Sequence, residues 1–338
     1  MQDAESYANL REVEFLSRVS PHQNLVRAHE IFVDNAMLQC HIVMESMEMN
    51  LYDLIKSRNG MYFPSRAIKE LLYQIASGLN HIHQHGFFHR DVKPENILIT
   101  PNSGQLQSYS LKLADFGLSR HVSCKDPYTT YVSTRWYRAP ELIFRCSEYT
   151  YCIDIWAFGA VAAELANLRP LFPGKDEMDL IERHISVLGT PDVSIFAGYW
   201  DHFYTFMSSS GFSIEPHVGL SPSQLLHNED YDLALLISYC IKWNPEMRIS
   251  ASALLRLPYF QSLNEPVQHL HRHTVNMNLP GNQNLVQTQS INPALCSSTT
   301  LSQGSSSVTS SATYSSNLSE NKAKPLVSHL ADYQNTYV

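Results

Sequence analysis

The strongest constraint on the fold of this chain is the string His89–Asn96, which reads HRDVKPEN and follows the clearest amphipathic stretch of the sequence. That stretch, Pro64–His85, has apolar residues at helical spacing and is closed by Gly86, so it predicts a helix. Downstream, the tripeptide Asp115-Phe116-Gly117 adds a further acidic residue. One string alone would fit a charged surface turn, but the two at this spacing indicate a specific site.

Together the two strings resemble the catalytic loop and the metal-binding loop of a protein kinase. The resemblance implies transfer of the γ-phosphate of ATP to hydroxyl groups of protein substrates. Asp91 would orient the attacking hydroxyl and accept its proton, and Lys93 would neutralise charge on the transferred group. Asn96 and Asp115 would offer the hard oxygen ligands that Mg²⁺ prefers. Taken singly, these residues also fit a loop carboxylate, a solvated lysine and a turn asparagine.

The run Pro127–Glu141, PYTTYVSTRWYRAPE, is similar to the end of the activation segment in the MAP kinase and cyclin-dependent kinase branch. This resemblance implies that an upstream kinase phosphorylates the T-x-Y element at Thr129 and Tyr131, which orders the loop. It also gives four residues a role: Arg90 and Arg135 bind the phosphates, Thr134 contacts the catalytic acid, and Arg138 lies in the substrate-docking segment. In this branch that arginine accompanies a preference for proline after the target residue.

Further motifs narrow the resemblance to the MAK/ICK/MOK family of serine/threonine kinases. They are MEMNLYDLI, GFFHRDVKPEN, the T-x-Y run, LRPLFPG and LGTP, and the similarity covers residues 8–262. Fungal members of that family act in meiosis and sporulation, so the resemblance implies a role there or in cell-cycle signalling. It also implies a buried ion pair between Glu141 and Arg248, and a helix at Asp154-Ile155-Trp156 that supports the catalytic loop from beneath.

One part of the kinase pattern is missing. No G-x-G-x-x-G string occurs, and the first lysine is Lys56, so the strand lysine that kinases use to hold ATP has no counterpart. Glu12 matches the helix glutamate that would pair with that lysine, while Met44 matches the gatekeeper and Glu45 and Met47 match the residues beside adenine. Met44 fits a plain core methionine equally well. We expect an N-terminally truncated kinase; the alternative is a catalytically silent kinase-like module that acts as a scaffold or competitor.

The predicted fold is α+β and kinase-like, with a mostly helical C-lobe and an incomplete N-lobe of one helix and about two strands. The expected boundaries are 1–47 for the partial N-lobe, 48–262 for the C-lobe and 263–338 for a disordered tail, which is rich in Ser, Thr, Asn and Gln. The N-lobe elements are a helix within 1–18, ended by Pro21, and an antiparallel strand pair. Predicted strands are Leu25–Val33, Met37–Met44, Asn96–Ile99 and Leu111–Leu113; further helices are 50–57, Tyr151–Asn167, Met178–Leu188, Tyr231–Lys242 and Ser250–Leu257, with a loop-rich stretch at 190–228.

The composition of the chain limits its expected partners and cellular compartment. The chain has 338 residues, a formal net charge of −8 and no basic stripe, which argues against nucleic acid as a partner. Its six cysteines form no C-x-x-C pair, which suits a reducing cytosol or nucleus. We find no signal peptide and no apolar run near the ~20 residues that span a bilayer. The expectation is a cytoplasmic or nuclear monomer whose partners are protein substrates and an activating kinase, with no membrane partner.

Four histidines close in sequence, His81, His83, His85 and His89, suggest a metal site as a rival hypothesis. On a helix, His81 and His85 share a face and His83 points away, and no fourth ligand is suitably spaced. We therefore expect helix-end histidines that interact with terminal carbonyls, and we expect His89 to contact Phe116.

Overall fold

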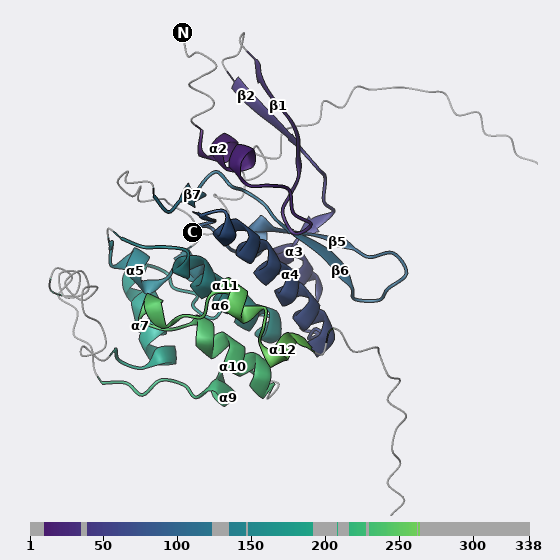
Figure 1. The fold of residues 1–338 in the computed structure, drawn as a ribbon. Coiled ribbons are helices and arrows are strands. Elements are labelled where there is room, and N and C mark those ends of the chain that lie inside the picture. The colour runs from purple at the N-terminus through teal and green to yellow at the C-terminus, as the bar shows by residue number, and fades with distance from the viewer. Residues whose placement is uncertain are drawn as a thin grey trace, which may run out of the picture. The chain divides into compact units, whose positions relative to one another are not determined.

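The computed structural model describes residues 10–34, 39–123, 135–146, 148–191, 208, 216–227, 230–261 and 263. All of them lie in the first of two compact units, residues 1–271 (Figure 1). The predicted tail, the T-x-Y element and most of the stretch 190–228 lie outside the described residues.

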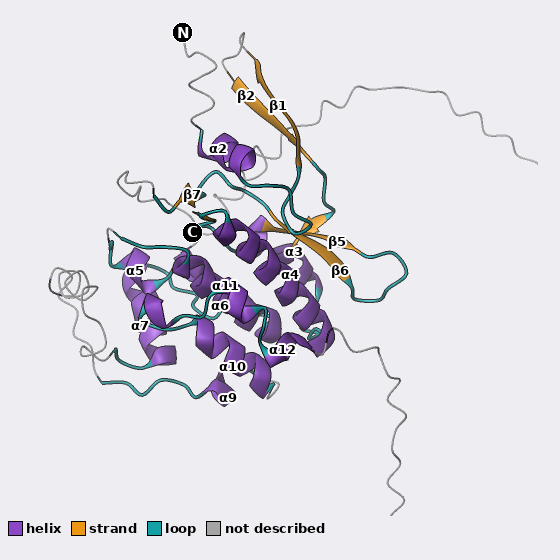
Figure 2. Ribbon diagram, in the orientation of Figure 1, coloured by secondary structure: helices purple, strands orange, loops and turns teal. Residues whose placement is uncertain are grey.

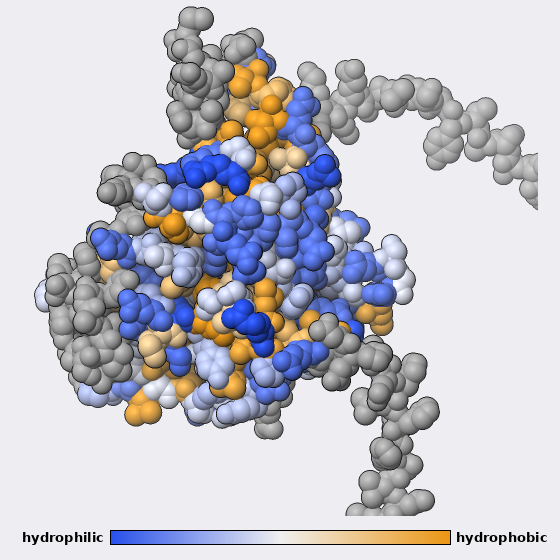
Figure 3. Space-filling view, in the orientation of Figure 1, coloured by the Kyte–Doolittle hydropathy of each residue, from blue (hydrophilic) through white to orange (hydrophobic). Residues whose placement is uncertain are grey.

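The N-terminal part consists of helix α2 (Arg11–Arg18) and strands β1 (Ala28–Asp34) and β2 (Gln39–Met44). The strands pair antiparallel, with Ile31 opposite Ile42, which confirms the predicted pair. The helix predicted within residues 1–18 ends at Arg18 as expected, because Val19 is already extended and Ser20, as the residue before a proline, is disfavoured in helical conformation. Figure 3 shows apolar side chains gathered around β1 and β2.

Two helices make the centre of the larger part. In α4 (Ser65–Gln84), the apolar face predicted from the sequence is buried, and the helix ends at Gly86 with φ 76°. In α6 (Cys152–Asn167), every residue from Ile153 to Ala166 is buried, because α4, α10 (Tyr231–Cys240) and two 3₁₀ turns surround it. An apolar surface all around a helix is the pattern of a buried one.

A three-stranded antiparallel sheet lies beside α4, in the order β3 (Met49–Asn50), β5 (Ile97–Pro101), β6 (Tyr109–Leu113) (Figure 2). Ile97 of β5 pairs with Leu113 of β6. The residue before β5, Asn96, therefore lies next to the residues that follow β6. The β5–β6 hairpin thus brings the two polar strings of the sequence together.

The remaining elements are short or peripheral. They are α3 (Leu51–Ser57), β4 (Phe87–Phe88), β7 (Arg120–His121), α5 (Pro140–Ile143), α7 (Glu177–Leu188), α9 (Pro222–Leu225), α11 (Ala251–Leu254) and α12 (Pro258–Gln261), with 3₁₀ turns at Pro94–Asn96, Arg135–Tyr137 and Pro245–Met247. The helix predicted over Ser250–Leu257 is confirmed at its start, where Ser250 caps α11, but it ends at Leu254; α12 starts anew at Pro258, since a proline is well placed in the first turn of a helix. The helix predicted to reach Lys242 ends at Cys240.

Candidate active site

Asp91 is held by two neighbours in its own loop. Lys93 Nζ lies 2.8 Å from Asp91 Oδ2, and the Asn96 amide nitrogen donates to the same carboxylate oxygen and to the Asp91 carbonyl, each at 2.9 Å. Asn96 is buried. The three polar residues expected to act together are therefore in direct contact.

Asp115 is brought to this loop by the β5–β6 hairpin. The N–H of Ala114 donates to the Asn96 carbonyl at 2.9 Å, and Asp115 follows with a φ of 63°, a conformation that is uncommon outside glycine. Burial disfavours the charge of Lys93, but Asp91, Glu95 and Asp115 outweigh this effect and raise the pKa of the lysine. The cationic form of Lys93 is therefore favoured by Asp91, Glu95 and Asp115.

The loop is anchored from below by Asp154 of α6. Its carboxylate accepts hydrogen bonds from the N–H groups of His89 at 2.7 Å and of Arg90 at 2.8 Å. His83 Nε2, from the last turn of α4, lies 2.9 Å from the same carboxylate. Although burial opposes ionisation, hydrogen bonding and charge from His83 lower the pKa of Asp154. The expectation that this helix supports the loop is confirmed, and the support explains how Arg90 is held at φ 73°.

Phe116 is enclosed by aromatic rings from two distant segments. Phe15 of α2 stacks on it with ring centroids 4.2 Å apart and an interplanar angle of 14°. His89 lies 5.6 Å away on another side, and its Nε2 is 3.0 Å from the Ala114 carbonyl oxygen. The predicted contact between His89 and Phe116 is confirmed. Through Phe15, α2 also contacts the tripeptide Asp115-Phe116-Gly117.

Glu12 of α2 faces the same string. Its carboxylate oxygen lies 3.9 Å from the position that a Cβ would take on Gly117, and Asp115 Oδ1 lies 3.5 Å from that position. Burial and the charge of Asp115 raise the pKa of Glu12, against a hydrogen bond from the Phe116 backbone. Among the described residues, no lysine or arginine forms an ion pair with it.

The segment expected beside adenine follows β2. Met44 ends that strand, and the N–H of Glu45 donates to the Arg27 carbonyl at 3.0 Å, so the carbonyl is the backbone group that Glu45 can offer to a ligand. The Glu45 carboxylate pairs with Lys112 Nζ at 2.8 Å. The sulfur of Met47 faces Thr100 Oγ1 of β5 at 3.7 Å.

The arginines expected to bind phosphate and substrate lie on the same side as Asp91. Burial and the nearby Arg135 lower the pKa of Arg138, while Asp91 acts in the opposite direction. Arg90 donates to the Leu118 carbonyl at 3.2 Å and to the Tyr149 hydroxyl at 2.7 Å. The phosphorylation sites expected to meet Arg90 and Arg135, Thr129 and Tyr131, lie outside the described residues, and so does Thr134, which was expected to contact Asp91.

Sequence reasoning missed a buried acidic group beneath the loop. Tyr137 donates to Glu164 of α6 at 2.6 Å, and burial raises the pKa of Glu164 to about 7. Burial also raises the pKa of Glu95, which interacts electrostatically with Tyr137 and Glu164. Glu164 among the apolar residues in the second half of α6 was the available signal, since an acid in such surroundings is seldom buried without a partner.

The predicted ion pair between Glu141 and Arg248 is confirmed. The guanidinium binds both carboxylate oxygens, at 2.6 and 2.7 Å, and both residues are buried. Arg248 also lies over the Trp156 ring, 5.1 Å from its centroid. Two parallel hydrogen bonds give this pair a defined geometry.

The histidines do not form a metal site within the described residues, where no group of three or more ligands is found. His83 binds Asp154, while His85 Nδ1 lies 2.8 Å from the carbonyl oxygen of His81. The helix-end interpretation is therefore confirmed for His85, whereas His83 has a carboxylate partner that the sequence did not reveal.

Within the described residues, no helix is long and apolar enough to cross a membrane.

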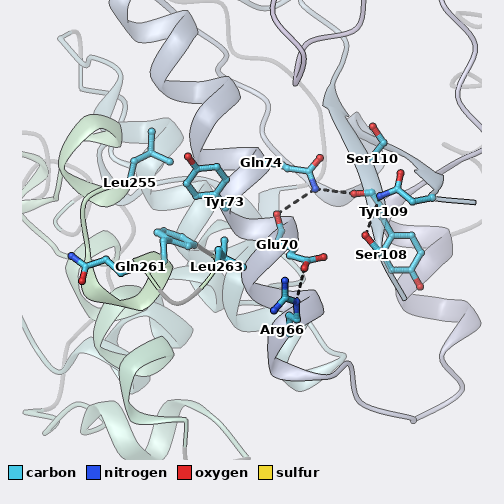
Figure 4. Close-up of a pocket in the computed structure, with 12 residues that line it drawn as sticks. Arg66, Glu70, Tyr73, Gln74, Ser108, Tyr109, Ser110, Leu255, Gln261 and Leu263 are labelled. Atoms are coloured by element: carbon cyan, nitrogen blue, oxygen red, sulfur yellow. Dashed lines mark hydrogen bonds and ion pairs between the residues drawn. The ribbon is translucent and has the colours of Figure 1, made fainter. Parts of the chain in front are cut away.

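A separate pocket of about 440 Å³ lies between α4, the β5–β6 loop and α12 (Figure 4). Gln74 is one of the residues that line it: its amide nitrogen donates to the Tyr109 carbonyl at 2.8 Å, and its amide oxygen accepts from the Leu111 N–H at 2.9 Å. In this way a side chain of α4 provides hydrogen-bond partners for backbone groups at the edge of strand β6. None of the predicted site residues lines this pocket.

Comparison with known proteins gives the family. The protein kinase domain family matches residues 1–260. The chain is 41% identical over 282 residues to the meiosis induction protein kinase IME2/SME1 of Saccharomyces cerevisiae, which covers 76% of this chain and 44% of that protein. It is 43% identical over 253 residues to the human serine/threonine-protein kinase MAK (75% and 38%) and 43% over 257 residues to the mouse serine/threonine-protein kinase ICK (76% and 39%). The chain thus spans less than half the length of these relatives.

Proposed function

Because the chain belongs to the protein kinase family, in the serine/threonine group that includes MAK, ICK and IME2, we propose that it transfers the γ-phosphate of ATP to serine or threonine hydroxyls of proteins. The observation that carries this proposal is the contact of Asp91 with Lys93 and Asn96, next to Asp115. In phosphoryl transfer a protein contributes mainly positioning and charge neutralisation. This arrangement supplies both.

Each residue has a distinct task. Asp91 orients the substrate hydroxyl and takes its proton, and the Asn96 amide keeps the carboxylate aimed. Lys93 balances the negative charge that develops on the transferred group. Because its cationic form is favoured by the acids around it, it carries this charge at neutral pH.

Asn96 and Asp115 fit a magnesium ion. The Asn96 amide nitrogen is bound to Asp91, which leaves its oxygen as the ligand, and Asp115 offers carboxylate oxygens beside it. Mg²⁺ is commonly bound by one or two protein oxygens together with substrate phosphates, which agrees with a pair rather than a full cage of protein ligands. The bound ion would neutralise phosphate charge.

The finer parts of the proposal rest on the resemblance of the sequence motifs to those of the family. We propose that phosphorylation of Thr129 and Tyr131 activates the protein and that Arg90 and Arg135 bind the two phosphates. Thr134 and Arg138 would take part in substrate docking. Glu12 would hold a nucleotide-binding lysine, and Met44, Glu45 and Met47 would line the adenine site. We place the lobe boundary at residues 47 and 48. Since one relative is a meiosis induction kinase, a meiotic or cell-cycle role is the process we propose.

A second candidate is a kinase-like module that binds regulators without transferring phosphate. The observation that favours it is Glu12, which faces Asp115 without an ion-pair partner among the described residues. The two candidates differ in nucleotide binding. In a thermal-shift titration, Mg·ATP should raise the melting temperature of an active kinase and leave the melting temperature of a silent module unchanged.

The decisive variant is Asp91→Asn, which keeps the shape of the side chain and removes the base. We expect transfer from labelled ATP to a serine/threonine peptide library to fall by about 10²–10⁴-fold, the usual contribution of a general base. The melting temperature should change little. Asp232→Asn, an exposed acid on α10, is the matched control and should retain full activity. Full activity in Asp91→Asn would show that the base is wrongly assigned.

A further inference from the structure

Ser20 lies in the segment between α2 and β1, and its hydroxyl faces the last turn of α4. Ser20 Oγ is 3.1 Å from Nε2 of His85 and 3.3 Å from Nε2 of His81. His81 Nε2 also lies 2.8 Å from the Ser20 carbonyl oxygen. Ser20 is exposed and is followed by Pro21. An accessible hydroxyl is thus held between two imidazoles.

The hydrogen bonds define which atom donates. His85 Nδ1 lies 2.8 Å from the His81 carbonyl, and a ring nitrogen can approach a carbonyl oxygen in this way only as a donor. In the neutral ring, Nε2 of His85 then carries the lone pair, so the Ser20 hydroxyl donates to it. A hydroxyl, a ring acceptor and a group that orients the ring form the arrangement typical of an activated serine.

A third histidine extends the group. His22 stacks on His81 with ring centroids 4.6 Å apart, and His81 and His85 are 4.4 Å apart. Burial, His81 and Lys112 lower the pKa of His22, so this ring stays neutral without an anion nearby. His81 lies in the last turn of α4 and His85 is the residue directly after the helix, so both rings lie at the carbonyl end of α4.

We propose that Ser20 is a phosphorylation site whose phosphate is bound by the imidazoles of His81 and His85. A proline-directed serine kinase acting in trans supplies the group. Ser20 Oγ forms a bond to the γ-phosphorus of ATP, the bond from that phosphorus to ADP breaks, and the hydroxyl proton passes to the base of that kinase. The product carries about −1.5 to −2 charges and favours imidazolium at both rings.

The modification would act on α2. The Val19 N–H donates to the Phe15 carbonyl at the end of this helix, and Ser20 follows directly. The same helix carries Glu12 and Phe15 against Asp115 and Phe116. A phosphate bound by two imidazolium rings would therefore link the end of α2 to the end of α4, with the imidazolium charges offsetting the repulsion from the two helix C-termini, and would keep α2 against Asp115-Phe116-Gly117.

The test starts from the full chain, treated with a purified proline-directed kinase and ATP and mapped by mass spectrometry. Ser221, in the one other Ser-Pro dipeptide, is the matched control: it is exposed, and its hydroxyl donates to Gln224 at 2.9 Å. We expect phosphate at Ser20 and none in Ser20→Ala. Modification of Ser221 with Ser20 unmodified would overturn the assignment.

Binding of the phosphate is tested separately, with phosphoserine incorporated at position 20 during translation. Phosphorus NMR should give a second phosphate pKa below its usual value of about 6, and His81→Asn with His85→Asn should restore the usual value. Hydrogen exchange in α2 should slow several-fold on phosphorylation. A phosphate that titrates normally in the unsubstituted chain would refute binding by the histidines. Neither measurement uses the activity of this chain, so failure here is distinct from failure of the proposed function.

Discussion

The segment Phe88–Gly117 and the β1–β2 pair belong to the same unit, but their residues are held very differently. In the first, His89, Asn96 and Phe116 are almost completely buried, with exposed fractions of 0 to 3%. In the second, apolar side chains remain open to solvent: Ile31 is 39% exposed and Phe32 is 44% exposed.

The difference lies in the number of independent supports. Asp154 and Phe15 hold the segment Phe88–Gly117 from two other elements, α6 and α2, and the segment's own β5–β6 hairpin pairs its two halves. The described part of β1 and β2 pairs strand to strand, and a two-stranded sheet alone is marginally stable in water. The residues that we propose for phosphoryl transfer are thus positioned by α6, α2 and the β5–β6 hairpin and not by β1 and β2.

The largest effect should come from breaking the support beneath the catalytic segment. Asp154→Ala removes the acceptor of two buried N–H groups and the partner of His83. We expect a loss of about 3–5 kcal/mol in the free energy of unfolding, because breaking a buried charged network leaves its partners unsatisfied. Urea denaturation measures the loss, and Asp232→Asn should change stability by no more than about 0.5 kcal/mol. Equal stabilities would contradict the role of Asp154 as a support.

A pH-dependent effect of intermediate size should come from His184 in α7. The ring is fully buried among Trp156, Phe172 and Trp243, and burial lowers its pKa from 6.5 to about 3. Between these values the unfolded chain binds a proton that the folded chain does not, so stability falls as pH falls below 6.5. At pH 5 this cost is about 2 kcal/mol.

His184→Ile should remove that dependence, which thermal unfolding at pH 7 and pH 5 can measure. His29→Asn, at an exposed position of β1, is the control and should leave the dependence as it is. An unchanged pH slope in His184→Ile would show that other groups cause the loss of stability in acid.

The smallest effect should come from the exposed strands. Phe32→Ser removes a ring that stacks on His41 at 4.9 Å but is largely in contact with solvent. We expect a change within about 0.5 kcal/mol, the range of surface substitutions without a special contact. A loss of more than about 2 kcal/mol in the free energy of unfolding, measured by urea denaturation, would mean that β1 and β2 are held as firmly as the segment Phe88–Gly117.

Several features were predictable because they depend on local pattern. The apolar face of α4, the antiparallel pair β1–β2 and the polar strings at His89 and Asp115 are all visible in residue order. The pairing of Glu141 with Arg248 came from family resemblance, since no local pattern joins residues so far apart. The short strands β3, β4 and β7 were missed, because two residues show no periodicity.

The sequence alone indicated the chemistry that we propose, since Asp91, Lys93, Asn96 and Asp115 are recognisable from their spacing. Only the tertiary structure decided what surrounds them. Tyr137 meets Glu164, His83 meets Asp154, and Ser20 meets His81 and His85 because segments that are distant in the chain pack against one another. Such contacts depend on burial and on the direction of each side chain, and residue order specifies neither until the core has formed.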